Sequence, residues 1–179
     1  FEPFLKYIRN TLKETNIALL SSNISTLYNV IQLASALNMT RSPFSYFFIN
    51  TDVSLLEDFL NNVYGSIRCN ISGLQIVRND PRMKSELALT VEAVFAVGKG
   101  LWHLVSSEAE TPHPTAILCD KDDIWEDGLR LNDAIRRGEQ ESSLTGRVRF
   151  DAAGRRFEPS LHAITRVHNK FTEASFISS

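Results

Sequence analysis

Residues 17–49, IALLSSNISTLYNVIQLASALNMTRSPFSYFFI, have the pattern of a strand, a helix and a second strand. The run Ile17–Leu20 is apolar at every position, which is typical of a parallel strand buried on both faces. Residues 26–37 carry apolar side chains at helical spacing, and Tyr46–Ile49 forms the next strand. A strand–helix–strand order predicts parallel pairing through a right-handed crossover. The stretch therefore places the chain in the α/β class.

The same alternation continues on both sides of this unit. Pro3–Glu14 has one apolar face and Pro in its first turn, which predicts a helix. Further helices are predicted at 55–64, 86–105 and 125–137, and further strands at 74–77, around Val148 and Phe150, and at 161–167. Asp151–Gly154 reads as the turn of a closing hairpin between the last two strands. We expect a mainly parallel sheet with a C-terminal β-hairpin.

Composition sets loose limits on function. The chain has 179 residues, of which 43% are hydrophobic and 22% charged, as in an ordinary globular domain. A net charge of −2 gives no electrostatic reason to expect nucleic acid or anionic lipid as a partner. No uninterrupted apolar run approaches the roughly 18 residues that span a bilayer.

Polar residues follow three of the predicted strands. They are Ser21–Asn23, Asn50–Asp52 and Arg78–Asp80. Ligands of open α/β sheets bind at the carboxyl ends of the strands, so these residues could hold a small zwitterion. The same residue types also cap helices and form turns, and capping is the favoured interpretation.

Patterns of enzyme chemistry are absent from the sequence. Gly98–Gly100 lacks the spacing of a phosphate-binding loop, and the acidic run Asp120–Asp123 lacks the later ligands and the glycine of a calcium loop. The four histidines show no metal spacing. The basic run Arg147, Arg149, Arg155 and Arg156 could bind phosphate, but a solvated strand face explains it more simply. We expect no enzyme activity, no cofactor and no metal.

Three sequons and two cysteines raise the question of compartment. Asn23, Asn38 and Asn70 each begin an Asn-x-Ser/Thr triplet, and Asn23 is also a candidate helix cap. Cys69 and Cys119 could form one disulfide in an extracellular protein, and two buried free thiols are the alternative.

Several blocks, in order along most of the chain, resemble the amino-terminal domain of ionotropic glutamate receptors of the kainate or delta type, within the wider family of receptor ligand-binding regions. The blocks are IQLASALNMT at 31–40, SYFFINTD at 45–52, NISGLQIV at 70–77, LALTVEAVFAV at 87–97, and Cys119, Trp125 and LTGRVRFDAAG at 144–154.

This resemblance implies an α/β, type I periplasmic-binding-protein-like bilobal clamshell, of which residues 1–179 form a partial amino-terminal domain with no second domain. It implies an extracellular position on the plasma membrane, at synapses, and a role in subunit assembly and modulation of gating. The expected partners are other subunits, in homo- or heterodimers within a tetrameric channel, and a small extracellular ligand. The membrane would be reached only through downstream segments. Helix 26–37 is a candidate dimer face, with core packing favoured.

The chain also departs from the family's pattern. It resembles only the second half of the domain, and the link between Arg78 and Glu86 is shorter than usual. In the family the cysteine matching Cys119 bonds to a partner in the first half, so Cys119 would bond outside this chain or to Cys69. Half a clamshell exposes apolar faces, so we expect it not to be a stable monomer.

Two other functions remain open from the sequence. A different receptor or solute-binding protein of the same fold would bind an amino acid or another small ligand directly. A cytosolic α/β enzyme is disfavoured, because no reactive group of residues is visible.

Overall fold

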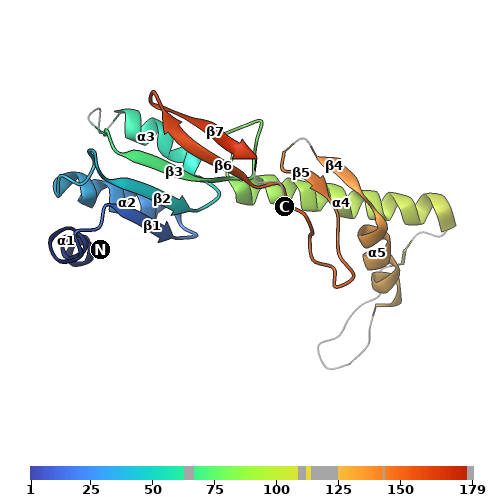
Figure 1. The fold of residues 1–179 in the computed structure, drawn as a ribbon. Helices are drawn as coiled ribbons and strands as arrows, with labels where there is room; N and C mark the ends of the chain where they lie inside the picture. The colour runs from blue at the N-terminus through green and yellow to red at the C-terminus, as the bar shows by residue number, and fades with distance from the viewer. Residues whose placement is uncertain (63–66, 109–111, 114–124, 143, 177–179) are drawn as a thin grey trace. The chain divides into compact units, whose positions relative to one another are not determined.

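A computed structural model describes residues 1–62, 67–108, 112–113, 125–142 and 144–176 (Figure 1). The chain divides into two compact units. Unit 1 comprises Phe1–Ser85 and Leu161–Ser179, and unit 2 comprises Glu86–Ser160. The units are considered one at a time below.

Unit 1 is built on a five-stranded sheet of order β1-β2-β3-β6-β7. The first three strands, β1 (Asn16–Leu20), β2 (Ser45–Ile49) and β3 (Asn70–Gln75), pair in parallel. β6 (His162–Val167) runs antiparallel to both β3 and β7 (Lys170–Phe176). The α/β class and the parallel pairing of β1 with β2 are confirmed, and the complete sheet is mixed.

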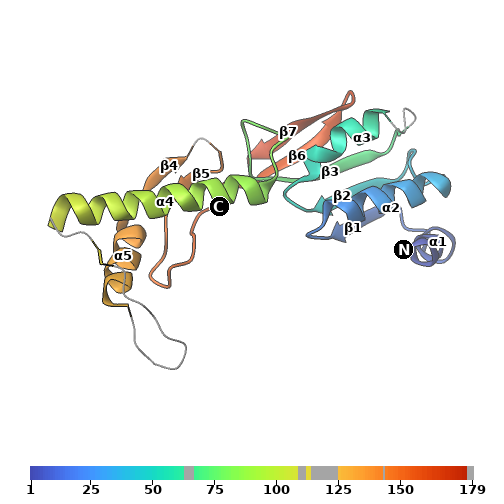
Figure 2. The same ribbon diagram turned by 180° about the vertical axis from the view of Figure 1, so that it is seen from behind.

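Five helical segments of unit 1 contribute to a single core on one face of this sheet. They are α1 (Glu2–Tyr7), the π-helical turn η1 (Ile8–Leu12), α2 (Ile24–Ala36), the 3-10 turn η2 (Val53–Leu55) and α3 (Leu56–Asn62). Figure 2 shows α2 and α3 over that face. Tyr46, Phe48 and Ile71 of the sheet are fully buried against Leu27 and Ile31 of α2. The apolar side of the helix predicted at 26–37 therefore packs in the core, as favoured, and not at a dimer face.

The opposite face of the sheet, which we call the open face, is apolar at β1 and β2. It carries Ala18 and Leu20 of β1 and Phe47 and Ile49 of β2. Leu20 is 76% exposed. The prediction that residues 17–20 are buried on both faces is wrong, because β1 is an edge strand and the described helices of unit 1 pack on the other face.

The closing hairpin predicted from the sequence is wrong in its strand pairing. The turn itself is present: the Gly154 amide donates to the Asp151 carbonyl oxygen at 2.9 Å, and Phe150 bridges to Arg156. However, strand 162–167 pairs with β3 and β7, not with residues 147–150. The period of two identifies a strand but not its partner. The strand predicted at 74–77 is also shifted: β3 spans Asn70–Gln75, and Asn70 pairs with Ser45 of β2.

Unit 2 contains α4 (Ser85–Glu108), α5 (Glu126–Arg137) and a small hairpin of β4 (Gln140–Ser142) and β5 (Gly146–Val148). A Cβ atom on Gly100 of α4 would lie 2.5 Å from Cγ1 of Ile135 and 3.2 Å from its amide nitrogen. Glycine therefore permits the close approach of α4 and α5 at this point.

Helix α4 packs through small side chains and exposes large ones. Ala88, Ala96 and Gly100 are buried. Of the residues predicted to be buried, only Leu104 is, and Val91 is half-buried. Eight large apolar side chains of α4 are exposed, and all but Leu89 and Val97 lie on one side of the helix. We call this row the apolar stripe: Leu87, Val94, Phe95, Leu101, Trp102 and Val105. Helical period locates such a stripe without revealing whether anything covers it.

By length and composition alone, Ser85–Ser106 of α4 could cross a membrane, with a mean hydropathy of 1.3. Buried core helices of soluble proteins meet the same criterion, whereas 28% of this window is buried. Glu92 in the middle of α4 is bonded to other parts of unit 2, as described below, which is the environment of a helix in a folded domain.

Candidate functional site

The carboxyl ends of β1, β2 and β3 meet at one edge of the sheet, which we call the carboxyl edge. The Asn50 side chain donates to the Ser21 carbonyl oxygen at 2.6 Å and accepts from the Asp52 amide at 2.7 Å. The sequence-predicted residues of the first two loops are thus brought together. Their polar groups, however, mainly bind each other.

Helix capping, and in the case of Asp80 a turn, account for three of the residues considered as ligand holders. Oδ1 of Asn23 accepts the Ser25 amide at 2.9 Å at the start of α2. Oδ1 of Asp52 accepts both the amide and the hydroxyl of Ser85, at 2.7 and 2.6 Å, where α4 begins. Oδ1 of Asp80 accepts the Arg82 amide at 3.0 Å.

A cavity of about 340 Å³ lies in unit 1 at this edge. Nδ1 of the buried His162 lies 2.8 Å from Oε1 of Glu173, and Nη2 of Arg78 lies 3.5 Å from Oε2 of the same carboxylate. Gln75 and Asn79 add amide groups to the lining, and Pro81, Ile164 and Phe171 complete it. The cavity therefore offers a cation, an anion and neutral donors within one small volume.

Sequence reasoning finds part of this cavity. Arg78 and Asn79 stand out because they follow a predicted strand. His162 and Glu173 are missed, since they reach the cavity only through the pairing of β6 with β3 and β7. No local signal in the sequence marks that pairing.

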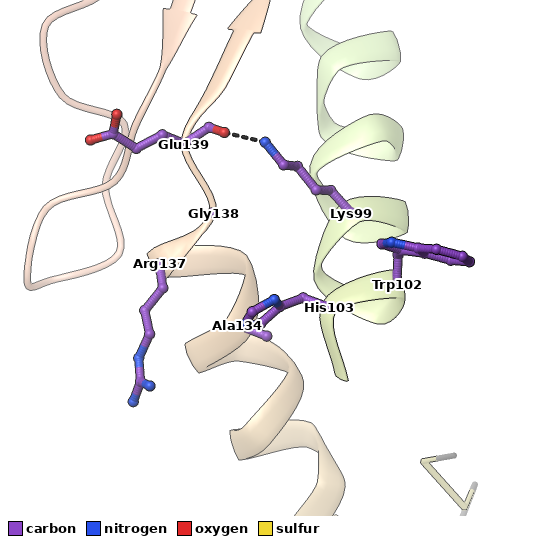
Figure 3. Close-up of a pocket in the computed structure, with 7 residues that line it drawn as sticks. All are labelled: Lys99, Trp102, His103, Ala134, Arg137, Gly138 and Glu139. Atoms are coloured by element: carbon purple, nitrogen blue, oxygen red, sulfur yellow. Dashed lines mark hydrogen bonds between the residues drawn. The ribbon is translucent and has the colours of Figure 1, made fainter. Parts of the chain in front are cut away.

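A second cavity, of about 280 Å³, lies between α4 and the end of α5 (Figure 3). Nζ of Lys99 donates to the Glu139 carbonyl oxygen across its upper end. His103 points from α4 toward Ala134, and Arg137 is paired with Asp133 of its own helix. Lys99 and Arg137 thus have protein partners, as Arg78 and His162 of the first cavity do through Glu173.

Thr145 of the block LTGR at 144–147 belongs to a buried polar cluster of unit 2. Glu92 and Thr145 are 3% and 2% exposed. The Thr145 amide and hydroxyl donate to the Glu92 carboxylate at 3.0 and 2.5 Å. Nη1 of Arg156 donates to the same carboxylate at 2.9 Å, and Nη2 donates to the Thr145 hydroxyl at 2.7 Å. This cluster joins α4 to the distant segment that contains Thr145 and Arg156, and it is structural.

The basic run does not form a phosphate site. Arg147 and Arg149 each pair with Glu139, and also with Glu141 and Glu158 respectively. The other two arginines pair with Asp151 and Glu92. Each guanidinium is therefore neutralised by a carboxylate, whereas the sequence predicted only a solvated strand face.

The structure describes one of the two cysteines. Cys69 is a buried free thiol in the core of unit 1, and burial raises its pKa to about 11. Cys119 and the acidic run 120–123 lie outside the described residues. A disulfide of Cys119 with Cys69 or with another chain therefore stays a prediction.

All three sequon asparagines, Asn23, Asn38 and Asn70, are exposed in unit 1. Their glycosylation stays a prediction. Within the part of the chain that the structure describes, no group of three or more His, Cys, Asp or Glu side chains is placed to hold a metal ion.

Comparison with known proteins identifies one family. The profile described as receptor family ligand binding region matches residues 2–167, which is most of the chain. Domains of this kind are typically extracellular, generally non-catalytic, and have a periplasmic-binding-protein-like fold. No curated protein sequence matches the chain.

Proposed function

The chain belongs to the family of receptor ligand-binding regions, and from this premise we propose that it is part of the amino-terminal domain of a glutamate-gated ion channel subunit. In this proposal it lies on the extracellular face of the plasma membrane and acts in subunit assembly and in the modulation of gating. The ordered blocks that resemble the kainate and delta receptors, ending in LTGRVRFDAAG at 144–154, support this choice within the family.

The apolar stripe of α4 is the observation that carries a role in assembly. Val94, Phe95 and Trp102 are 68%, 63% and 73% exposed on one side of a 24-residue helix. A contiguous apolar surface of this kind marks a contact with another protein surface. The open face of unit 1, with Phe47 and Ile49, adds a second apolar surface.

Sedimentation velocity of the purified chain tests this role. We expect a dimer or a larger species, and the variant Phe95→Glu should shift it toward monomer. Leu129→Glu is the matched control, because Leu129 is 64% exposed on α5 and lies outside the apolar stripe. A monodisperse monomer with a sharp unfolding transition would contradict the proposal.

The cavity at Arg78 favours a second candidate, a domain that binds a small ligand directly. The Arg78 guanidinium and the Glu173 carboxylate pair at 3.5 Å, and in this candidate function they exchange that contact for the two charges of an amino acid. We expect L-glutamate or glycine to raise the melting temperature in this case. Arg78→Ala should abolish that shift, whereas Arg82→Ala, a nearby exposed arginine, should retain it. No shift with a panel of amino acids would exclude this candidate.

A further inference from the structure

The sheet of unit 1 ends in two edge strands, β1 and β7, which differ in how they are protected. β7 carries Lys170 and Glu173, and its pairing with β6 is irregular, two features that hinder pairing of an edge with a further strand. β1 has the sequence NIALL, with no charge, no proline and a regular register with β2. It is apolar at every position after Asn16, which is typical of a central strand. The edge at β1 is therefore the unprotected one.

The hydrogen bonds to β2 fix which backbone groups of β1 point outward. The Ser45 amide donates to the Thr15 carbonyl oxygen at 2.8 Å. Backbone groups alternate in direction along a strand, so the odd-numbered residues of β1 bond to β2. The even-numbered residues turn both their amide and their carbonyl group away from the sheet: Asn16, Ala18 and Leu20.

These outward groups are accessible. Within the described residues, nothing bonds to the backbone of Ala18 or Leu20 from the outer side, and both residues are exposed. The Asn16 amide donates to Oε1 of Glu14 at 2.9 Å, a local contact that a strand could replace. Figure 1 shows β1 at the margin of the sheet, with α1 near its amino end. A row of outward donors and acceptors is matched by another extended strand.

We propose that β1 pairs antiparallel with β1 of a second copy of the chain, across a two-fold axis at Ala18. Ala18 then lies opposite its own copy, and Asn16 lies opposite Leu20 of the second copy. Each of these pairs exchanges two backbone hydrogen bonds. On the helix-covered face, the half-buried Ile17 meets Leu19 of the second copy, which adds apolar contact. The interface is self-complementary, as a two-fold axis requires.

The charges around β1 favour a second copy as the partner. The nearest charged residues before the strand are Lys13 and Glu14. In the proposed register they lie opposite Asn23 and Ser22 of the second copy, so no like charges meet. The pairing does not depend on the receptor assignment, and it is a contact separate from that of the apolar stripe.

Opposite charges at the axis test the pairing by sedimentation velocity of the purified chain. We expect Ala18→Asp and Ala18→Lys, each alone, to self-associate at least about tenfold more weakly, because like charges meet at the axis. An equimolar mixture of the two should recover the association, since opposite charges then meet. Ala174→Asp and Ala174→Lys, at an exposed position of β7, are the matched controls and should change nothing. Unchanged association of either Ala18 variant, or a mixture as weak as its parts, would overturn the proposal.

A second measurement does not depend on the folding of the charged variants. In a chain with Cys119→Ser, Ala18→Cys brings together two residues whose Cα atoms are about 5.5 Å apart in the proposed pair, within the range of a disulfide. Mild oxidation should trap a covalent dimer, whereas Ala174→Cys should give none. Adding Phe95→Glu separates the two contacts: trapping at Ala18 persists even if the apolar stripe has no role in assembly. Absence of a covalent dimer with Ala18→Cys overturns the pairing of β1 and leaves the proposed function intact.

Discussion

The hydroxyl of Thr145 donates a 2.5 Å hydrogen bond to the carboxylate of Glu92, 53 positions earlier in the chain. Arg156 neutralises that carboxylate at 2.9 Å. A buried carboxylate is tolerated only where it is paired and hydrogen-bonded, so these contacts explain why Glu92 can occupy the packed side of α4.

Removing the cation should destabilise unit 2. Arg156→Ala leaves Glu92 buried without its partner, and we expect a loss of about 3–5 kcal/mol in the free energy of unfolding. Arg155→Ala is the matched control, because Arg155 is an exposed neighbour paired with Asp151, and it should change little. Both tryptophans, Trp102 and Trp125, lie in unit 2, so urea titration followed by tryptophan fluorescence reports this unit. Equal effects of the two variants would contradict the role of the cluster.

Two glycines of α4 should respond in opposite directions to alanine. A Cβ atom on Gly98 would meet no other atom within 4 Å, so Gly98→Ala should stabilise the helix by up to about 1 kcal/mol. At Gly100 the new methyl group would meet Ile135 at 2.5 Å, and Gly100→Ala should cost about 1–3 kcal/mol. Thermal unfolding followed by tryptophan fluorescence gives both values. A stabilised Gly100→Ala protein would show that α5 does not approach α4 at this point.

The buried thiol predicts a loss of stability at alkaline pH. The pKa of Cys69 is raised from 9.0 to about 11 in the folded protein, so the unfolded chain releases its proton first as the pH increases. The stability that the folded protein gains from keeping this thiol protonated is fully present below pH 9 and is lost as the pH approaches 11. By pH 10 we expect a decrease of about 1 kcal/mol.

The control for this pH effect is Cys69→Ala, which is less stable at pH 7 but lacks the thiol. The difference in unfolding free energy between pH 7 and pH 10, from urea titrations followed by circular dichroism, should be smaller in the variant. An identical decrease in both proteins would assign the effect to other groups, such as Tyr46, whose pKa burial also raises.

The Tyr46 hydroxyl should stabilise unit 1 through one hydrogen bond. Tyr46→Phe leaves the buried Met39 carbonyl oxygen without its donor, and we expect a loss of about 1–2 kcal/mol. Tyr28→Phe is the comparison: its hydroxyl donates to Leu55 at 3.2 Å in a half-buried position, and a smaller loss is expected. Chemical denaturation followed by circular dichroism distinguishes the two, and a larger loss for Tyr28→Phe would reverse this ranking.

Local patterns locate most elements of the fold. The helices predicted at 26–37, 86–105 and 125–137 end within three residues of the observed ends of α2, α4 and α5. Their apolar spacing is set by neighbours in sequence, so it can be read without tertiary information. The turn at Asp151–Gly154 is found for the same reason.

The candidate site is only partly predictable. Arg78 is visible because it follows a strand, but its partner Glu173 lies 95 positions away. Which strands pair, and in which register, depends on contacts between distant residues. The cavity that these residues line could therefore not be inferred.

By itself the sequence determined the α/β class, the order of the elements, the family resemblance and the three asparagines open to modification. The tertiary structure decided that β1 is an edge strand, that most large apolar residues of α4 face solvent, and that Thr145 bonds to Glu92. The reason is physical: periodicity is a local property of the chain, whereas burial and proximity depend on which surfaces meet after folding.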